Sequence, residues 1–321
     1  MTIEHAHAHA IAKPWGVVDL RPWSNVSRDG GAVGEIWYER PGTGVPIPSL
    51  LLKLLFTNQP LSIQVHPDDT FARSIGLSSG KTEAWYVLSA APEAKVALGL
   101  NQRLTPQEFR EAIDDGSIAD IVRWQTVSPD DVIFVPAGTI HAIGAGLVIA
   151  EIQQRSDVTF RLFDYGRLRE LHIENAIMVA NAGPADLPLK ASRLTDERTL
   201  LVSSPHFVFE RIDLAPNSAW RLDAECETWI LVLNGNARAG PFDVAIGDAV
   251  FAQSDRVDIH VGKVGVAALA AYKATSPLPH LLQPLRPPGS IDVGPRLGVQ
   301  VPTSRARAKA PPTLGRPDIV Q

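Results

Sequence analysis

The stretch VPAGTIHAIGAG occupies residues 135–146 and contains the pattern P-x-G-x-x-H. Pro136 fixes its own φ, and Gly138 adopts backbone conformations that other residues disfavour, so the pair predicts a tight turn between two strands. His141 then emerges at the start of the second strand. We therefore expect this turn to place His141 on the second strand as a candidate metal ligand.

The segment LSIQVHPDD (61–69) carries two more polar side chains at a regular spacing. Side chains alternate between the two faces of a strand, so Gln64 and His66 point the same way. A β-sheet presents two metal ligands together at this two-residue spacing. The segment therefore predicts two ligands on one strand.

The segment GKTEAWYVL (80–88) places Glu83 at the start of an apolar strand. A carboxylate buried there needs a cation or a metal ion as its partner. Lys81 points to the same face if the strand extends back to it, so an ion pair of Glu83 with Lys81 or Lys53 is the alternative to a metal. The other ligand types that accompany Glu83 favour the metal.

The four side chains offer two imidazoles, one carboxylate and one amide oxygen, a set that suits Zn²⁺ and can also hold Fe, Mn or Co. Cys226 is the only cysteine, which excludes an internal disulfide and a cysteine-rich zinc site and fits a reducing compartment. A ligand set without cysteine predicts a metal that keeps positions open for water or a substrate oxygen.

The segment AEIQQRSDVTFRLFDYGR (150–167) concentrates ionisable side chains on a strand and the turn after it. Glu151, Asp157 and Arg161 are its main candidates for chemistry. Few structural strands carry so many such groups, whereas a strand that lines an active site needs them.

Strand-like segments dominate the remaining sequence, which predicts a mainly β protein of the sandwich or jelly-roll type. Residues 105–124 are the exception, because Thr105, Pro106 and Glu108 form the start signal of a helix.

The net charge of −5 argues against nucleic-acid binding. No apolar run is long enough for a membrane helix, and residues 1–15 lack the features of a signal peptide, so we expect a cytoplasmic protein with no membrane partner.

Taken together and in this order, the motifs resemble the class I mannose-6-phosphate isomerase family in its short bacterial form. The segments QVHPDD, GKTE-WY, VPAGTIHAIG and EIQQ-SD-T-RL-DYGR carry the match, and PWG (14–16) and GEIW (34–37) add to it. The resemblance extends over residues 14–275 and implies two cupin (jelly-roll) β-barrel domains with a short helical insertion in the first. It also implies metal-dependent interconversion of mannose 6-phosphate and fructose 6-phosphate through an enediolate.

The resemblance further assigns roles to individual residues. It implies one Zn²⁺ per chain, bound by Gln64, His66, Glu83 and His141. It places in the active cleft Lys81, Glu151, Asp157 and Arg161, with Lys81 and Arg161 also binding the substrate. The residue types leave the base undecided among Lys81, Glu151 and Asp157, while Arg161 can stabilise either the enediolate or the phosphate.

The same patterns predict how the chain is divided. We expect a flexible N-terminus (1–13), a catalytic metal-binding cupin (14–190), a second, metal-free cupin (191–275) and a Pro/Gly-rich, disordered tail (276–321). The sequence does not specify the oligomeric state.

One position departs from the family pattern. Longer members carry His-Lys-Pro-Glu, and that histidine is associated with opening the sugar ring, whereas Gly80 precedes Lys81 here. Another group or water then opens the ring, or the open-chain form is the substrate. The glycine keeps open the alternative of a non-catalytic sugar-phosphate-binding or regulatory cupin. An Fe(II) cupin oxygenase is a third hypothesis, disfavoured because such an enzyme does not need the basic pair Lys81 and Arg161.

Overall fold

The computed structural model describes residues 3–26, 31–42, 44–185 and 190–285, and these residues form three antiparallel sheets and four helices. The first sheet has the strand order β2 (His7–Ile11), β3 (Glu35–Glu39), β4 (Leu50–Thr57), β11 (Leu147–Gln154), β6 (Glu83–Ala90), β9 (Val132–Val135). The second has the order β12 (Phe160–Phe163), β5 (Ile63–Val65), β10 (His141–Ile143), β7 (Lys95–Leu100), β8 (Val122–Thr126). The helices are α1 (Asp69–Ser74), α2 (Pro106–Asp114), α3 (Ile118–Ile121) and α4 (Ile173–Val179).

The third sheet contains ten strands from the two ends of the described chain. Its main path runs β1 (Glu4–His5), β19 (Ala249–Ala252), β17 (Thr228–Ala239), β20 (Asp255–Tyr272), β15 (Val208–Leu214), β14 (Arg198–Ser203), β13 (Ser192–Arg193). Its side branches are β16 (Ala219–Ala224), β18 (Phe242–Ala245) and β21 (Leu282–Pro284). The prediction of a mainly β, cupin-like fold is thereby confirmed.

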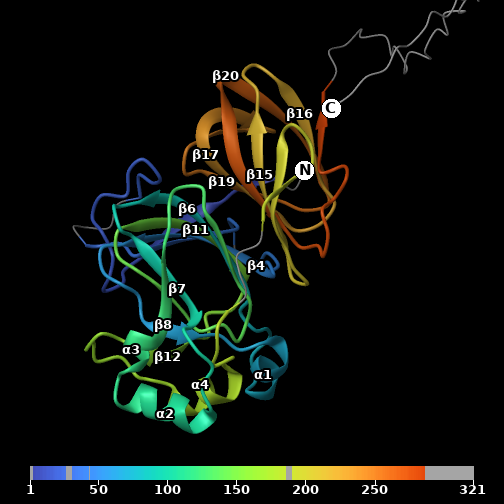
Figure 1. Cartoon of the computed structure of the whole chain (residues 1–321). Coiled ribbons are helices and arrows are strands. Elements are labelled where there is room, and N and C mark those ends of the chain that lie inside the picture. The colour runs from blue at the N-terminus through green and yellow to red at the C-terminus, as the bar shows by residue number, and fades with distance from the viewer. Residues whose placement is uncertain (1–2, 27–30, 43, 186–189, 286–321) are drawn as a thin grey trace, which may run out of the picture. The chain divides into compact units, whose positions relative to one another are not determined.

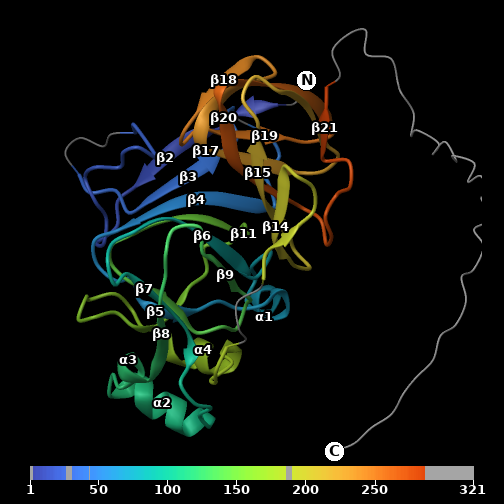
Figure 2. The same ribbon diagram turned by 45° about the horizontal axis from the view of Figure 1, so that its top comes forward.

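The sheets are stacked in layers. The six-stranded sheet lies between the five-stranded and the ten-stranded sheets (Figure 1). Helices α2, α3 and α4 pack against the outer face of the five-stranded sheet (Figure 2). One apolar core joins the six-stranded sheet to the second half of the chain, with Leu54 and Tyr86 on one side and Phe207 and Trp229 on the other. The two predicted cupin domains therefore share a core, and the boundary near residue 190 stays a prediction.

Strand β4 illustrates how this layering positions the site. Its even-numbered residues, such as Leu52 and Leu54, belong to the core shared with the second half. Its odd-numbered residues Lys53 and Leu55 face the five-stranded sheet, where they line a cavity. Both faces of the strand are covered, so every one of its residues is buried.

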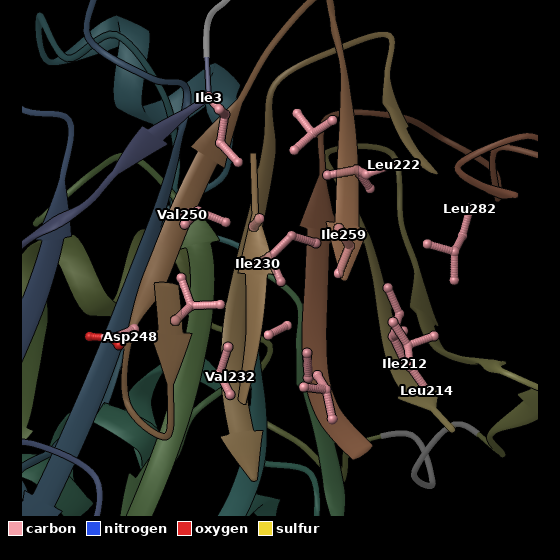
Figure 3. A pocket seen from close by; sticks show the side chains of 16 residues that line it. Ile3, Ile212, Leu214, Leu222, Ile230, Val232, Asp248, Val250, Ile259 and Leu282 are labelled. Atoms are coloured by element: carbon pink, nitrogen blue, oxygen red, sulfur yellow. The ribbon is translucent and has the colours of Figure 1, made fainter. Parts of the chain in front are cut away.

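Aliphatic side chains fill the interior of the second half (Figure 3). Ile212, Ile230 and Ile259 come from three different strands of the ten-stranded sheet and belong to one apolar cluster. Asp248 lies at the edge of this interior, and its carboxylate accepts a hydrogen bond of 2.9 Å from the backbone N–H of Ala245. This core stabilises the second half by removing apolar surface from water.

Both ends of the described chain differ from expectation. Residues 4–5 and 7–11 form β1 and β2 where a flexible terminus is predicted, because their backbones pair with β19 and β3. Strand β21 lies inside the predicted tail and pairs with β16. The rest of that prediction falls on residues 286–321, outside the described residues.

The predicted helical insertion corresponds to α2 and α3. Thr105 and Glu108 form the expected capping box, in which the Glu108 carboxylate accepts a 2.7 Å hydrogen bond from the Thr105 backbone N–H. The insertion ends at Ile121, and residues 122–124 begin β8 instead, because Val122 pairs with Leu100 of β7. No helix in the described part of the chain is both long and apolar enough to cross a membrane.

Candidate metal centre

The predicted metal ligands lie on facing strands of the six-stranded and five-stranded sheets. Glu83 begins β6 in one sheet, while Gln64 of β5 and His141 of β10 pair directly in the other. His66 follows β5. The apolar neighbours of Gln64 on β5 pack against the helices, so strand alternation turns Gln64 and His66 toward Glu83.

The donor atoms of these side chains converge. Glu83 Oε1 lies 3.4 Å from His141 Nε2, and Glu83 Oε2 lies 3.5 Å from His66 Nε2. One ligand atom from each of the three residues lies within 4.8 Å of the others. Among the described residues, His66, Glu83 and His141 are the histidine and carboxylate side chains whose geometry could hold a metal ion.

Gln64 is adjacent to this group but presents its amide nitrogen. Its Nε2 lies 3.2 Å from His141 Nε2, and its Oε1 accepts a 3.0 Å hydrogen bond from the Ser62 hydroxyl. A half-turn of the amide exchanges the two atoms and brings the oxygen to the metal-facing position. The role of Gln64 as a ligand requires that rotation.

Backbone carbonyls set the tautomer of both histidines. Nδ1 of His66 donates to the carbonyl of Val158 at 2.8 Å, and Nδ1 of His141 donates to the carbonyl of Thr139 at 2.8 Å. The Nε2 lone pairs therefore face Glu83. Burial lowers the pKa of both imidazoles, and together with the Lys81 charge it brings the pKa of His66 to about 3. Both rings are neutral near pH 7, as metal ligands must be.

Glu83 supplies the negative charge of the group. Burial alone raises the pKa of Glu83, but the charge of Lys81 outweighs burial and holds that pKa well below its usual range. Its Oε2 atom is buried and lies 3.1 Å from Lys81 Nζ and 3.5 Å from His66 Nε2. A divalent cation fits this donor set, because a carboxylate and two neutral imidazole nitrogens that converge are the ligands such an ion accepts.

Lys81 lies in the loop before β6, and its ammonium still reaches the group. Its Nζ is 3.1 Å from Glu83 Oε2 and 3.1 Å from His66 Nε2. Burial lowers the pKa of Lys81, but Glu83, Glu151 and Asp157 outweigh burial and raise that pKa above its usual value. Lys81 is therefore a buried, charged neighbour of the candidate metal ligands.

The absence of a histidine before Lys81 has a structural reason. A Cβ atom at Gly80 would lie 2.5 Å from the Pro67 carbonyl oxygen and 2.5 Å from the Asp68 carbonyl carbon. Both contacts are with backbone, which cannot rotate away. The Gly80 backbone N–H also donates to the Asp69 carboxylate at 2.8 Å. No side chain fits at this position without a movement of the backbone.

Glu151 lies at the centre of β11, between Lys53 and Trp85 on the neighbouring strands. Trp85 Nε1 donates to Glu151 Oε2 at 3.1 Å, and Lys53 Nζ lies 3.5 Å from Glu151 Oε1. Burial and the nearby Glu83 raise the pKa of Glu151 to about 7, although Lys53 and Lys81 oppose the change. The predicted alternative of a Lys53–Glu83 pair is not what the structure contains, because Lys53 pairs with Glu151.

Arg161 and Asp157 occupy the more open side of the same cavity, which measures about 80 Å³. Asp157 is exposed, and Arg161 is partly buried on β12 beside Gln64. The Arg161 Nε atom is buried and has no hydrogen-bond partner within the described ranges. Six of the eight predicted residues line this cavity: Gln64, Lys81, Glu83, Glu151, Asp157 and Arg161. His66 and His141 contact Glu83 beside it.

The cavity also contains charged residues that the sequence motifs did not single out for the site. They are Lys13, Glu35, Lys53 and Arg169. Glu35 accepts a 2.6 Å hydrogen bond from Trp37 Nε1 and lies 3.1 Å from Lys13 Nζ, while Lys53 Nζ lies 4.6 Å from the centre of the Trp37 ring. Lys53 could have been found from the sequence, because it lies inside the apolar segment SLLLKLLF and a lysine there must face a polar cavity.

Comparison with known proteins finds relatives in sequence and in structure. No family model matches the chain. A mannose-6-phosphate isomerase of Streptococcus mutans is 42% identical over 170 residues, which are 49% of this chain and 52% of that protein. The chain thus aligns with about half the length of this curated relative.

Solved structures match over a greater length. The mannose 6-phosphate isomerase of Bacillus subtilis superimposes with a TM-score of 0.73 at 25% identity, covering 85% of this chain and 100% of that chain. A zinc-bound mannose 6-phosphate isomerase superimposes with a TM-score of 0.67 at 12% identity, over 85% of this chain and 100% of that chain, and shows the same fold. The chain is thus similar to mannose-6-phosphate isomerases in sequence over about half of its length and in fold over most of it.

Proposed function

We propose that this protein is an aldose–ketose isomerase that interconverts mannose 6-phosphate and fructose 6-phosphate through an enediolate, with one zinc ion per chain. The activity is the one named for its relatives, and one structural neighbour is zinc-bound. The observation that carries the proposal is the position of Glu83, which contacts His66, His141 and Lys81. The candidate ligands His66 and His141 and the catalytic candidate Lys81 thus all contact the Glu83 carboxylate.

His66, Glu83 and His141 would hold the metal, with Gln64 as the fourth ligand. A metal ion bound there would supply Lewis-acid polarisation of the carbonyl and hydroxyl oxygens of the sugar. Iron, manganese or cobalt are alternatives that the same donors accept.

The proton transfer between C1 and C2 is assigned to Glu151 in this proposal. A group with a pKa near neutrality both accepts and releases a proton under physiological conditions. Lys81 keeps its charge and stabilises the oxyanion that develops on the substrate. Asp157 and Lys81 remain the other candidates for the base.

Arg161 is assigned to the substrate phosphate. It lines the open side of the cavity, and its guanidinium offers a permanent positive charge with the hydrogen-bonding geometry that suits a phosphate. Gly80 cannot open the sugar ring, and we assign that step to water or to spontaneous ring opening. We place the reaction in the cytoplasm, with the sugar phosphate as the small-molecule partner.

A non-catalytic sugar-phosphate-binding protein has less support. A binding site needs neither a buried carboxylate with a raised pKa nor a buried ammonium beside the candidate metal ligands, and this cavity contains both. These features favour turnover over binding alone.

The test is isomerisation of mannose 6-phosphate in deuterium oxide, with product deuteration read by NMR. We expect turnover by the zinc-loaded protein, loss of turnover and exchange in Glu151→Gln with zinc retained, and wild-type behaviour in Glu225→Gln, an exposed control. Turnover that persists in Glu151→Gln would move the base to Asp157 or Lys81. No turnover by the zinc-loaded wild-type protein would overturn the proposal.

A further inference from the structure

One row of side chains crosses the six-stranded sheet and reaches the metal centre. Trp37 of β3 lies opposite Lys53 of β4, which in turn lies opposite Glu151 of β11. On its other side Glu151 lies opposite Trp85 of β6, whose ring contacts His141. Residues directly opposite each other on antiparallel strands place their side chains on the same face, close enough to interact. The row therefore connects Trp37 to the carboxylate assigned to proton transfer.

Glu151 is held from both sides within this row. Lys53 Nζ lies 3.5 Å from Glu151 Oε1, and Trp85 Nε1 donates to Glu151 Oε2 at 3.1 Å. Lys53 and Glu151 are both buried, so bulk water does not replace either contact. The position of the Glu151 carboxylate thus depends on where the Lys53 ammonium lies.

The indole of Trp37 determines the place of that ammonium. Lys53 Nζ lies over the Trp37 ring, 4.6 Å from its centre. The face of an indole attracts a cation, and the attraction is stronger where water is excluded. A lysine carries its charge on a flexible four-carbon stem, so it needs such contacts to stay in one place. Trp37 and Glu151 together supply them.

Glu35 orients the indole. Trp37 Nε1 donates to Glu35 Oε2 at 2.6 Å, and Lys13 Nζ lies 3.1 Å from Glu35 Oε1. Burial alone raises the pKa of Glu35, but Lys53 and Lys13 outweigh burial and lower that pKa, so the acceptor is a charged carboxylate.

Trp37 acts on the site from outside the cavity. Glu35 and Lys53 line the cavity of the metal centre, whereas Trp37 is not among the described residues that line it. A substrate in the cavity would therefore meet Lys53 and not the indole behind it. Any effect of Trp37 on the reaction has to pass through its neighbours.

We propose that Trp37 is a positioning residue for Glu151, because its indole, oriented by Glu35, holds the Lys53 ammonium against the Glu151 carboxylate. The consequence for proton transfer rests on the proposed function, in which Glu151 is the base. The positioning itself does not, since it is a property of the protein without substrate.

A double-mutant cycle on the zinc-loaded full chain tests whether Trp37 acts through Lys53. Trp37→Leu removes the ring, and we expect kcat for mannose 6-phosphate to fall by about tenfold with little change in KM, as for a misplaced catalytic group. Trp37→Phe keeps an aromatic face and should recover most of kcat. In the Lys53→Met background, Trp37→Leu should cause no further loss, because the contact that it removes is already gone.

The matched control is Trp220→Leu. Trp220 is also half-buried and also donates its indole N–H, to the Ser218 hydroxyl at 2.9 Å, but it lies in the second half of the chain. This variant should leave kcat and KM unchanged. A loss of kcat in Trp220→Leu equal to that in Trp37→Leu would show a general effect of tryptophan removal and overturn the proposal.

NMR reads the positioning without turnover. The ring current of Trp37 should displace the signal of the Lys53 ε-methylene group, observed in the full chain with 13C-labelled lysine. We expect Trp37→Leu to abolish this displacement and Trp220→Leu to leave it unchanged. Glu35→Met, which removes the acceptor of the indole N–H, should move the signal in the same direction as Trp37→Leu. It gives the same test if Trp37→Leu does not fold.

Two results would overturn the proposal. One is a Lys53 signal that stays in place in Trp37→Leu or in Glu35→Met. The other is an equal loss of kcat on Trp37→Leu in the wild-type and Lys53→Met backgrounds. A zinc-loaded wild type without turnover, in which the Lys53 signal responds as expected, would overturn the proposed function and support the positioning.

Discussion

The ammonium of Lys81 lies 3.1 Å from the carboxylate of Glu83, inside the group of candidate metal ligands. A charge at this place has two opposite effects. It offsets the buried negative charge of Glu83, and it repels a divalent cation bound by the same carboxylate. Lys81 is therefore expected to lower metal affinity while it contributes to the reaction.

Replacing Lys81 by methionine separates these effects. We expect kcat to fall by about 100-fold or more, because the charge that stabilises the developing oxyanion is lost. Zinc binding, measured by titration with a competing chelator, should be as tight as in the wild type or tighter. The matched control is Lys95→Met, an exposed lysine that contacts Trp124. A variant that loses its zinc would show that Lys81 holds the site together instead.

Lys53 provides a test of the role of Glu151 through pH dependence. Lys53 is one of the cations that lower the pKa of Glu151, so its removal raises that pKa. If ionised Glu151 is the base, the acid limb of the profile of kcat/KM against pH shifts to higher pH in Lys53→Met. The limb should not move in Lys95→Met. A shift of the limb to lower pH would contradict this role.

Gly80→Ala tests the packing that excludes a histidine before Lys81. The added Cβ meets backbone atoms of Pro67 and Asp68, so we expect a loss of about 1–3 kcal/mol in the free energy of unfolding. Urea denaturation followed by circular dichroism measures the loss. Ser89→Ala, at an exposed position on β6, should change stability by no more than about 0.5 kcal/mol. Equal stability of the two variants would refute the steric explanation.

A buried ion pair in the second half gives a prediction on stability away from the site. Arg198 donates two hydrogen bonds of 2.8 Å to Glu210, which also accepts from the Tyr272 hydroxyl. Glu210→Gln leaves the Arg198 charge buried without its partner, so unfolding should become easier by about 3 kcal/mol or more. The activity per folded molecule should not change. Glu225→Gln serves as the exposed control, and an equal stability of the two variants would show that the pair contributes nothing.

The metal-ligand candidates were accessible from the sequence because strand alternation is local. Gln64 and His66 share a face over two residues, and the turn at Pro136 and Gly138 positions His141 without any long-range information. The predicted helix after Thr105 has the same origin, since its capping box spans only four residues. These predictions needed no knowledge of which strands pair.

The charged residues that surround the candidate site were less accessible. Lys53 lies in a strand that is apolar on both sides of it, and only the opposite sheet determines that one face borders a polar cavity. Partners such as Trp85 for Glu151 come from strands that are distant in sequence.

The N-terminal strands were missed although a signal was present. Histidine and alanine alternate with the period of a strand, and the alanines Ala6, Ala8 and Ala10 face the apolar core. The small size of alanine makes such an alternation a weak hydrophobic pattern. Pairing with β3 and β19 supplies the stability that the side chains alone do not.

The most direct test of the whole account is a zinc titration of the metal-free protein, with formation of fructose 6-phosphate from mannose 6-phosphate followed at each step. The account predicts that turnover is absent without metal and rises to a plateau at one zinc per chain. His141→Ala, which removes a candidate ligand, should neither retain zinc nor turn over. Full activity in the chelated protein or in His141→Ala, or no turnover in the zinc-loaded wild type, would contradict it.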